Sequence, residues 1–189
     1  MIRIGILGDI GSGKSFVSKN FGYPVFNADL EVSKLYKNNK KIFFKLKKKL
    51  PKYIFSFPIN KDEIIRAILA NKLNLKKIIK IVHLEIRKKM NIFINKNKNK
   101  KIIILDIPLL LENKINNKKD ILVFVESKKS DVLKRLKKRI NFNRQLLNRF
   151  QNIQLPLEYK KRKSHYIIKN NFTKKKIKRA VKDILVEII

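Results

Sequence analysis

Apolar residues in this chain gather in short continuous runs that are separated by longer segments with helical spacing. Continuous apolar runs of this length are typical of parallel strands that are buried on both faces. They predict five strands, at residues 2–7, 24–26, 102–105, 121–125 and 165–168. Parallel strands need long crossover segments between them, so the pattern predicts an α/β fold.

Between these runs, apolar residues recur every three to four positions with lysines in between, as in amphipathic helices. They predict helices at residues 15–20, 31–50, 62–71, 75–93, 130–138, 141–150, 157–163 and from 173 to the end. Asn60 and Thr173 directly precede two of these segments and are suitable N-caps. Pro51, Ser56 and Pro58 interrupt the helical pattern after the second segment.

The first predicted strand leads directly into Gly8–Ser15, whose sequence GDIGSGKS fits the phosphate-loop pattern G-x-x-x-x-G-K-[ST]. Glycines let backbone N–H groups surround an anion, and the following helix presents its positive end. Lys14 is expected to reach the β- and γ-phosphates of a nucleotide, and the Ser15 hydroxyl to contact Mg²⁺. For this composition, a chance match is expected in on the order of one chain per thousand.

A phosphate loop after the first of five strands predicts a doubly wound, five-stranded parallel sheet. In such sheets, ligands bind beyond the carboxyl ends of the strands. Lys14, Asp29 and Asp106 follow the first, second and third predicted strands, so they are candidates for one site. The chain has 189 residues, 44% of them hydrophobic, which is enough to bury a core as one compact domain.

The composition excludes several classes of function. Because the chain has no cysteine, it has no disulfide framework, thiolate chemistry or cysteine-based metal site. No apolar run approaches the roughly 18 residues of a membrane span. The N-terminus enters a strand and loop directly, without the pattern of a signal peptide. We therefore expect a cytoplasmic enzyme that does not bind membranes.

The formal net charge of +34 raises the possibility of nucleic-acid binding. Lysine, asparagine and isoleucine replace glycine, alanine and proline along the whole chain, as translation of an A+T-rich gene would produce. We interpret the excess charge as compositional and expect only non-specific binding to polyanions. The low-complexity segment 95–101 is expected to be a solvated loop. A basic nucleic-acid-binding protein with a vestigial phosphate loop is kept as an alternative.

An ordered set of short motifs resembles those of the dephospho-coenzyme A kinase family. The set comprises Ile10–Ser15, Asn27–Asp29, His83–Ile86, Pro108–Glu112, Gln154–Lys160 and Ile167–Asn170. The second is similar to the family's Asp-Ala-Asp element, the third to His-Pro-x-Ile and the fourth to Pro-Leu-Leu-Phe-Glu. A nucleoside monophosphate kinase of the same fold is a further alternative, against which the fourth motif argues.

This resemblance implies an enzyme that uses ATP and Mg²⁺ to phosphorylate the ribose 3′-hydroxyl of dephospho-coenzyme A. It also implies the fold of nucleoside monophosphate kinases, with a helical substrate region and a lid. We expect one domain with a core at 1–30, 101–134 and 164–189, a substrate-binding region at about 31–100 and a lid at about 135–163. We expect a monomer whose partners are small-molecule substrates and not a specific nucleic acid.

By resemblance, Asp29 is the catalytic aspartate, because a carboxylate there can accept the proton of the acceptor hydroxyl. An N-cap role for Asp29 stays open, since a helical pattern follows it. Lys14 and Arg139 are expected to stabilise the transferred phosphoryl group, and Arg139 matches the basic residue at the start of the family's lid. The residues expected to bind ATP are Gly11, Ser12, Gly13, Lys14, Ser15 and Phe16.

Further residues are expected around the acceptor and the metal. The acceptor side comprises Asp29, His83, Arg87, Pro108 and Leu109, and the metal side comprises Ser15 and Asp106. Asp106 is either a magnesium-side carboxylate or a strand-end residue with local hydrogen bonds. Glu112 is expected to orient its neighbours, and His165 to be structural.

Arginine is scarce beside lysine, and guanidinium groups bind phosphate in a bidentate manner. Arg135, Arg139, Arg144 and Arg149 are therefore candidate lid residues, with a solvated helix face as the alternative. Arg135 and Arg139 are four residues apart and are expected to share one helix face. Asn170 either contacts the adenine or ends the last strand.

The chain also departs from the family's pattern at several positions. The departures are Asp9 for Gly, Phe16 for Thr, Asn27 for the first Asp of Asp-Ala-Asp, Lys61 for Arg and Leu84 for Pro. Asp9 brings a negative charge near bound phosphates, and Phe16 removes a hydroxyl beside the α-phosphate. These changes bear on rate and affinity more than on the type of reaction.

Overall fold

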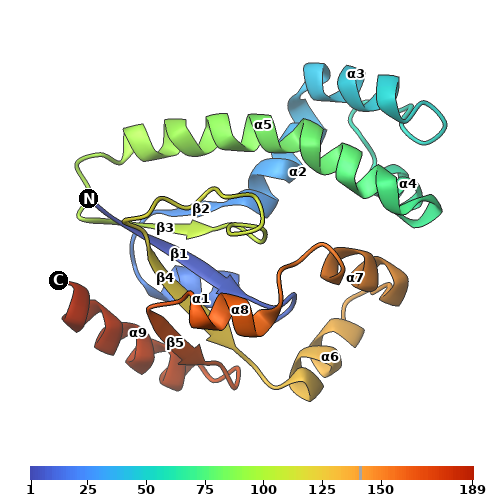
Figure 1. The fold of residues 1–189 in the computed structure, drawn as a ribbon. Helices are drawn as coiled ribbons and strands as arrows, with labels where there is room; N and C mark the ends of the chain where they lie inside the picture. The colour runs from blue at the N-terminus through green and yellow to red at the C-terminus, as the bar shows by residue number, and fades with distance from the viewer. Residues whose placement is uncertain (141) are drawn as a thin grey trace. The chain divides into compact units, whose positions relative to one another are not determined.

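The computed structural model describes residues 1–140 and 142–189, and this part of the chain contains one five-stranded sheet (Figure 1). The strands are β1 (Ile2–Gly8), β2 (Val25–Asn27), β3 (Ile102–Asp106), β4 (Ile121–Glu126) and β5 (Tyr166–Lys169). Their order is β2-β3-β1-β4-β5, and every neighbouring pair is parallel. The predicted five-stranded parallel α/β fold is confirmed.

Helices make up most of the remaining described chain. They are α1 (Lys14–Asn20), α2 (Ala28–Asn38), α3 (Lys40–Lys49), α4 (Lys61–Ala70), α5 (Lys72–Lys96), α6 (Lys129–Lys137), α7 (Arg144–Gln151), α8 (Leu157–Arg162) and α9 (Lys174–Ile188). Among the described helices, none is both long and apolar enough to cross a membrane.

The chain folds into two compact units. The sheet unit comprises Met1–Asn27, Ile94–Phe142 and Gln154–Ile189, and the helical unit comprises Ala28–Phe93 and Asn143–Ile153. The sheet unit therefore contains all five strands with α1, α6, α8 and α9. The helical unit contains α2, α3, α4, α7 and nearly all of α5.

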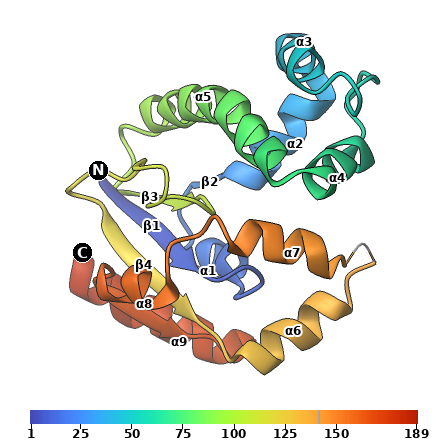
Figure 2. The same ribbon diagram turned by 45° about the vertical axis from the view of Figure 1, so that its right-hand side comes forward.

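The core of the sheet unit lies between the sheet and two helices, α1 and α9, which contact each other (Figures 1 and 2). Both helices bring apolar residues at helical spacing onto the sheet, where alternate strand residues meet them. The core residues include Ile4, Ile6, Val17, Phe21, Ile104, Val123, Val125, Ile168, Ile177, Val181 and Ile184. Each such side chain contributes about 1.5–3 kcal/mol on burial.

On the opposite face of β1, Gly5 leaves room for the loop that follows β3. A Cβ on Gly5 would lie 2.6 Å from Leu110 Cδ2 and 3.0 Å from Leu122 Cδ2. Leu110 is fully buried there. The absence of a side chain at Gly5 thus lets the Pro108–Glu112 segment pack directly on the sheet.

The helical pattern at 31–50, expected as one helix, forms two helices in the structure. The first, α2, begins at Ala28, and the second, α3, begins after Asn39. Asn39 has an extended backbone, and its side chain accepts a hydrogen bond from Ile42 N at 3.0 Å. The apolar period continues across this break, which is why the pattern alone did not reveal it.

The helix starts were predicted with mixed success. Asn60 caps α4 as expected, since its Oδ1 accepts from Asp62 N at 2.9 Å. Thr173 precedes α9 but does not cap it with its side chain; its hydroxyl donates to Asn171 Oδ1 at 2.8 Å. The helix expected from residue 141 begins at Arg144 and is capped by Asn143, while residue 141 lies outside the described residues.

Candidate functional site

The phosphate loop binds the side chain of Lys14 through its backbone carbonyl groups. Gly8, Gly11 and Gly13 have φ values of 145°, 82° and 93°, which side-chain-bearing residues rarely adopt. Lys14 Nζ donates to Gly8 O at 3.2 Å and to Asp9 O at 2.7 Å. The ammonium group is thus held against the loop, with its carbonyl oxygens as partners.

Residues around the loop leave no space for side chains at its glycines. A Cβ on Gly11 would lie 3.0 Å from Val132 and from Leu136, both on α6. A Cβ on Gly8 would lie 2.7 Å from Val125 O. The spacing of the motif therefore reflects close packing as well as backbone conformation.

Asp9, the unusual acid in the loop, accepts a hydrogen bond from the backbone of the next residue. Its Oδ1 accepts a hydrogen bond from Ile10 N at 2.7 Å, within the loop. Phe16, the other departure, is 39% exposed on α1, so it does not contribute to the core.

Three polar side chains meet where β2 and β3 end beside the loop. Asn27 and Asp106 are register partners on these neighbouring strands. Asn27 Nδ2 donates to Asp106 Oδ2 at 2.6 Å and lies 3.5 Å from Ser15 Oγ. Asp106 is only 3% exposed, and the Asn27 amide satisfies one of its oxygens.

This donor set can hold a magnesium ion that is shared with a nucleotide. Mg²⁺ is commonly bound by one or two carboxylates together with substrate phosphates and water. Ser15 and Asp106 supply a hydroxyl and one carboxylate of this type. No group of three or more His, Cys or acidic side chains suited to a metal occurs among the described residues.

Asn170 directly follows β5, and its side chain is turned to the phosphate loop. Its Nδ2 donates to Ser12 O at 2.7 Å, and Ser127 Oγ donates to the same oxygen at 3.0 Å. Sequence reasoning did not select Ser127, because a lone serine after a strand carries no distinctive signal. His165 is structural, since its Nδ1 accepts from Leu122 N at 2.9 Å.

The expectation for Arg135 and Arg139 is wrong in one respect. Helix α6 ends at Lys137, so Arg139 lies beyond the helix and does not share a helical face with Arg135. Arg135 stacks on the ring of Phe172, with its Cζ 3.9 Å from the ring centroid. Arg144 and Arg149 lie on α7, in the helical unit.

The segment after β3 is held by a buried ion pair that sequence reasoning did not identify. Glu112 Oε1 lies 2.6 Å from Lys160 Nζ, with side-chain exposures of 8% and 1%. The carboxylate also accepts from Leu155 N at 3.1 Å, and Lys160 donates to Gln154 at 3.1 Å. Glu112 thus orients its neighbours as expected, whereas nothing in the sequence indicated that Lys160, the last residue of the motif Gln154–Lys160, is its partner.

Pro108 and Leu109 belong to this segment and form its first turn. The Leu109 carbonyl accepts from Asn113 N at 3.2 Å and from Asn113 Nδ2 at 3.0 Å. These bonds fix the turn between the end of β3 and the Glu112 ion pair.

The remaining predicted site residues lie in the helical unit. Asp29 is in the first turn of α2 and is not its N-cap, because the helix begins one residue earlier. Ser33 Oγ donates to the Asp29 carbonyl at 3.0 Å. An acidic residue in this turn is favourable, since helix N-termini attract negative charge.

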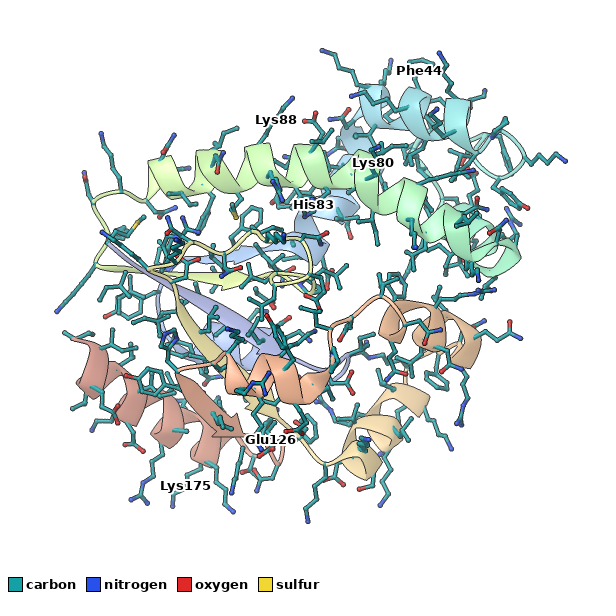
Figure 3. All side chains as sticks on the ribbon, in the orientation of Figure 1. Phe44, Lys80, His83, Lys88, Glu126 and Lys175 are labelled. Carbon is teal, nitrogen blue, oxygen red and sulfur yellow. The ribbon has the colours of Figure 1, made fainter. Side chains whose placement is uncertain are left out.

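His83 and Arg87 lie one turn apart on α5, where His83 is labelled in Figure 3. Burial is the main cause that lowers the pKa of His83, and the nearby Arg87 charge lowers it further. His83 Nε2 is buried and has no hydrogen-bond partner in the described part of the chain. The imidazole therefore favours its neutral form.

The family model and the sequence relatives agree on one family. A family model described as dephospho-CoA kinase matches residues 2–176. A dephospho-CoA kinase of Wolbachia pipientis wMel is 35% identical over 96% of this chain and 95% of its own length.

Two solved structures share the fold. One, from Thermus thermophilus, has a TM-score of 0.76 and 25% identity and covers 100% of this chain and 98% of its own. The other, a dephospho-CoA kinase from Campylobacter jejuni, has a TM-score of 0.64 and 20% identity, covering 98% and 96%.

Proposed function

This chain belongs to the dephospho-CoA kinase family, and from that premise we propose which of its residues perform the reaction. The protein is an ATP-dependent kinase that transfers the γ-phosphoryl group of ATP to the 3′-hydroxyl of dephospho-CoA. The observation that supports the assignment of residues is the closed phosphate loop beside the ends of β2 and β3.

Phosphoryl transfer requires in-line positioning and neutralisation of charge on the transferred group. In our proposal, the loop residues Gly11–Phe16 hold the phosphates of ATP, and Lys14 exchanges its bonds to Gly8 and Asp9 for phosphate oxygens. The carbonyl oxygens of Gly8 and Asp9, to which it donates in this structure, bind an ammonium group less strongly than charged phosphate oxygens do. Arg139 would add positive charge to the phosphates.

Ser15 and Asp106 are the residues that we propose to hold Mg²⁺. When bound, the ion would neutralise negative charge on the phosphates of ATP. Asn27 keeps the Asp106 carboxylate in place through its 2.6 Å hydrogen bond, and it adds no charge of its own. The site thus combines one carboxylate and one hydroxyl, which suits a metal that arrives with the nucleotide.

Asp29 is proposed as the group that accepts the proton of the 3′-hydroxyl and orients its oxygen toward the γ-phosphorus. It stands two residues after Asn27 along the chain. We further propose that residues at about 31–100 bind the acceptor, with His83 and Arg87 among them, together with Pro108 and Leu109. The segment at about 135–163 is proposed as the lid.

A panel of acceptors tests the function. ADP release is measured by a coupled assay with dephospho-CoA and, separately, with AMP, CMP, GMP and UMP as acceptors. We expect turnover with dephospho-CoA alone and a product phosphorylated at the 3′ position. Turnover of the nucleoside monophosphates with none of dephospho-CoA would contradict the assignment.

We also propose that the protein acts in the cytoplasm as a monomer, without a specific nucleic-acid partner. The charge of +34 will still attract polyanions, and such binding falls steeply with salt. Binding of one RNA or DNA sequence in preference to others at about 150 mM salt would contradict this part. Sedimentation analysis would test the oligomeric state.

A further inference from the structure

Two side chains from outside the phosphate loop hold one of its carbonyl groups. Ser127 directly follows β4 and donates to Ser12 O at 3.0 Å, and Asn170 directly follows β5 and donates to the same oxygen at 2.7 Å. We propose that Ser127 and Asn170 are positioning residues that direct the Gly13 N–H toward the phosphates of bound ATP. This inference rests on the proposed function of the loop.

The planarity of the peptide bond connects this contact to the ligand. In a trans peptide, the C=O and the N–H point in opposite directions. Two donors that hold the Ser12 carbonyl therefore also fix the direction of the Gly13 N–H. Among the described residues, no group accepts a hydrogen bond from the Gly13 N–H. It is a donor that the fold leaves for a ligand.

The orientation of the Asn170 amide follows from its other hydrogen bond. Its Oδ1 accepts from Phe172 N at 2.7 Å, so its Nδ2 is the atom that faces Ser12. The side chain is 4% exposed and cannot exchange this contact for water. A Cβ at Gly13 would collide with Asn170 Nδ2, so the glycine also makes room for this contact.

The two positioning residues directly follow two paired strands of the sheet. Glu126 and Lys169, which precede them, are register partners in the β4–β5 pair. The pairing extends one step further, because Asn170 N donates to Glu126 O at 2.7 Å. Functional groups held on paired strands keep their geometry better than groups on free loops. The two donors thus fix the Ser12 carbonyl relative to the central sheet.

The main test removes one donor with little change in packing. Ser127→Ala is compared with wild type by calorimetric titration with ATP, ADP and adenosine, and by the KM for ATP. We expect affinity for ATP and ADP to fall about 3- to 10-fold, as one hydrogen bond warrants, with adenosine unchanged. Ser127→Thr keeps a hydroxyl and should bind ATP like wild type.

Ser164→Ala is the matched control. It also removes a serine hydroxyl that donates to a backbone carbonyl, that of Lys160 at 2.8 Å, but away from the loop. Its ATP affinity should equal that of wild type. Unchanged ATP affinity in Ser127→Ala, or an equal loss for adenosine, would overturn the proposal. An equal loss in Ser164→Ala would overturn it as well.

A second variant keeps the test decisive if Ser127→Ala does not fold. Asn170→Asp retains the oxygen that accepts from Phe172 N but places a negative oxygen against Ser12 O. We expect it to lose about 10-fold or more in ATP affinity, and wild-type affinity would overturn the proposal. These titrations contain no acceptor, so they can be interpreted even if dephospho-CoA is not the acceptor. If wild type failed to bind ATP, that result would contradict the proposed function itself.

Discussion

The buried ion pair between Glu112 and Lys160 gives a quantitative prediction about stability. Lys160 is 1% exposed and Glu112 is 8% exposed, and their charged atoms are 2.6 Å apart. Removal of one partner leaves the other charge buried and unpaired, which costs about 3–5 kcal/mol. We therefore expect Glu112→Gln and Lys160→Met each to lower the free energy of unfolding by about this amount.

The double variant separates the pair energy from the loss of packing. With both charges gone, no buried charge is left without a partner, so the double variant should be more stable than the sum of the single losses predicts. For a chain of this size, each 1 kcal/mol corresponds to about 2–4 °C in melting temperature. Urea unfolding measures the free energies, and differential scanning calorimetry the melting temperatures.

An exposed pair in the same unit provides the control. Lys161 Nζ lies 2.7 Å from Glu126 Oε1, but both side chains are about one-third exposed. Glu126, labelled in Figure 3, ends β4. Screened pairs of this kind contribute about 0–1 kcal/mol. If Glu112→Gln and Lys160→Met lower the free energy of unfolding no more than Glu126→Gln and Lys161→Met do, the reasoning from burial is refuted.

Three further predictions concern the site. Asp29→Asn should lower kcat strongly with dephospho-CoA while ATP affinity stays the same, and equal turnover would contradict its proposed role. Gly13→Ala should cost about 1–2 kcal/mol in urea unfolding from its φ of 93° alone, and more because of the collision with Asn170. Burial and Arg87 lower the pKa of His83 in the folded state, so the unfolded state binds the proton first and wild type should lose stability as pH falls below 6.5. His83→Gln should not show this loss. Identical stability profiles from about pH 5 to pH 7.5 would contradict this.

Much of the sheet unit could be predicted because its signals are local. The five apolar runs gave strands within a residue or two of those observed. The phosphate loop was identified because glycine is rare in this chain, and a closed anion-binding turn requires glycine at fixed spacing. The break between α2 and α3 was missed, because one asparagine within a continuous apolar period resembles an ordinary surface residue.

Contacts between distant residues could not be predicted in the same way. Ser127, Asn170 and Ser12 meet because β4 and β5 end side by side near the loop, and a single serine or asparagine carries no pattern that predicts this. Lys160 belongs to the motif Gln154–Lys160, but only the fold shows that it is buried against Glu112.

The sequence by itself determined the α/β class, the phosphate loop and the family motifs, because periodicity and rare residues act over a few positions. Only the tertiary structure decided the partners of Asp106, Asn170 and Lys160. Those partners depend on strand register and on which side chains lose their water, and both are properties of the folded chain.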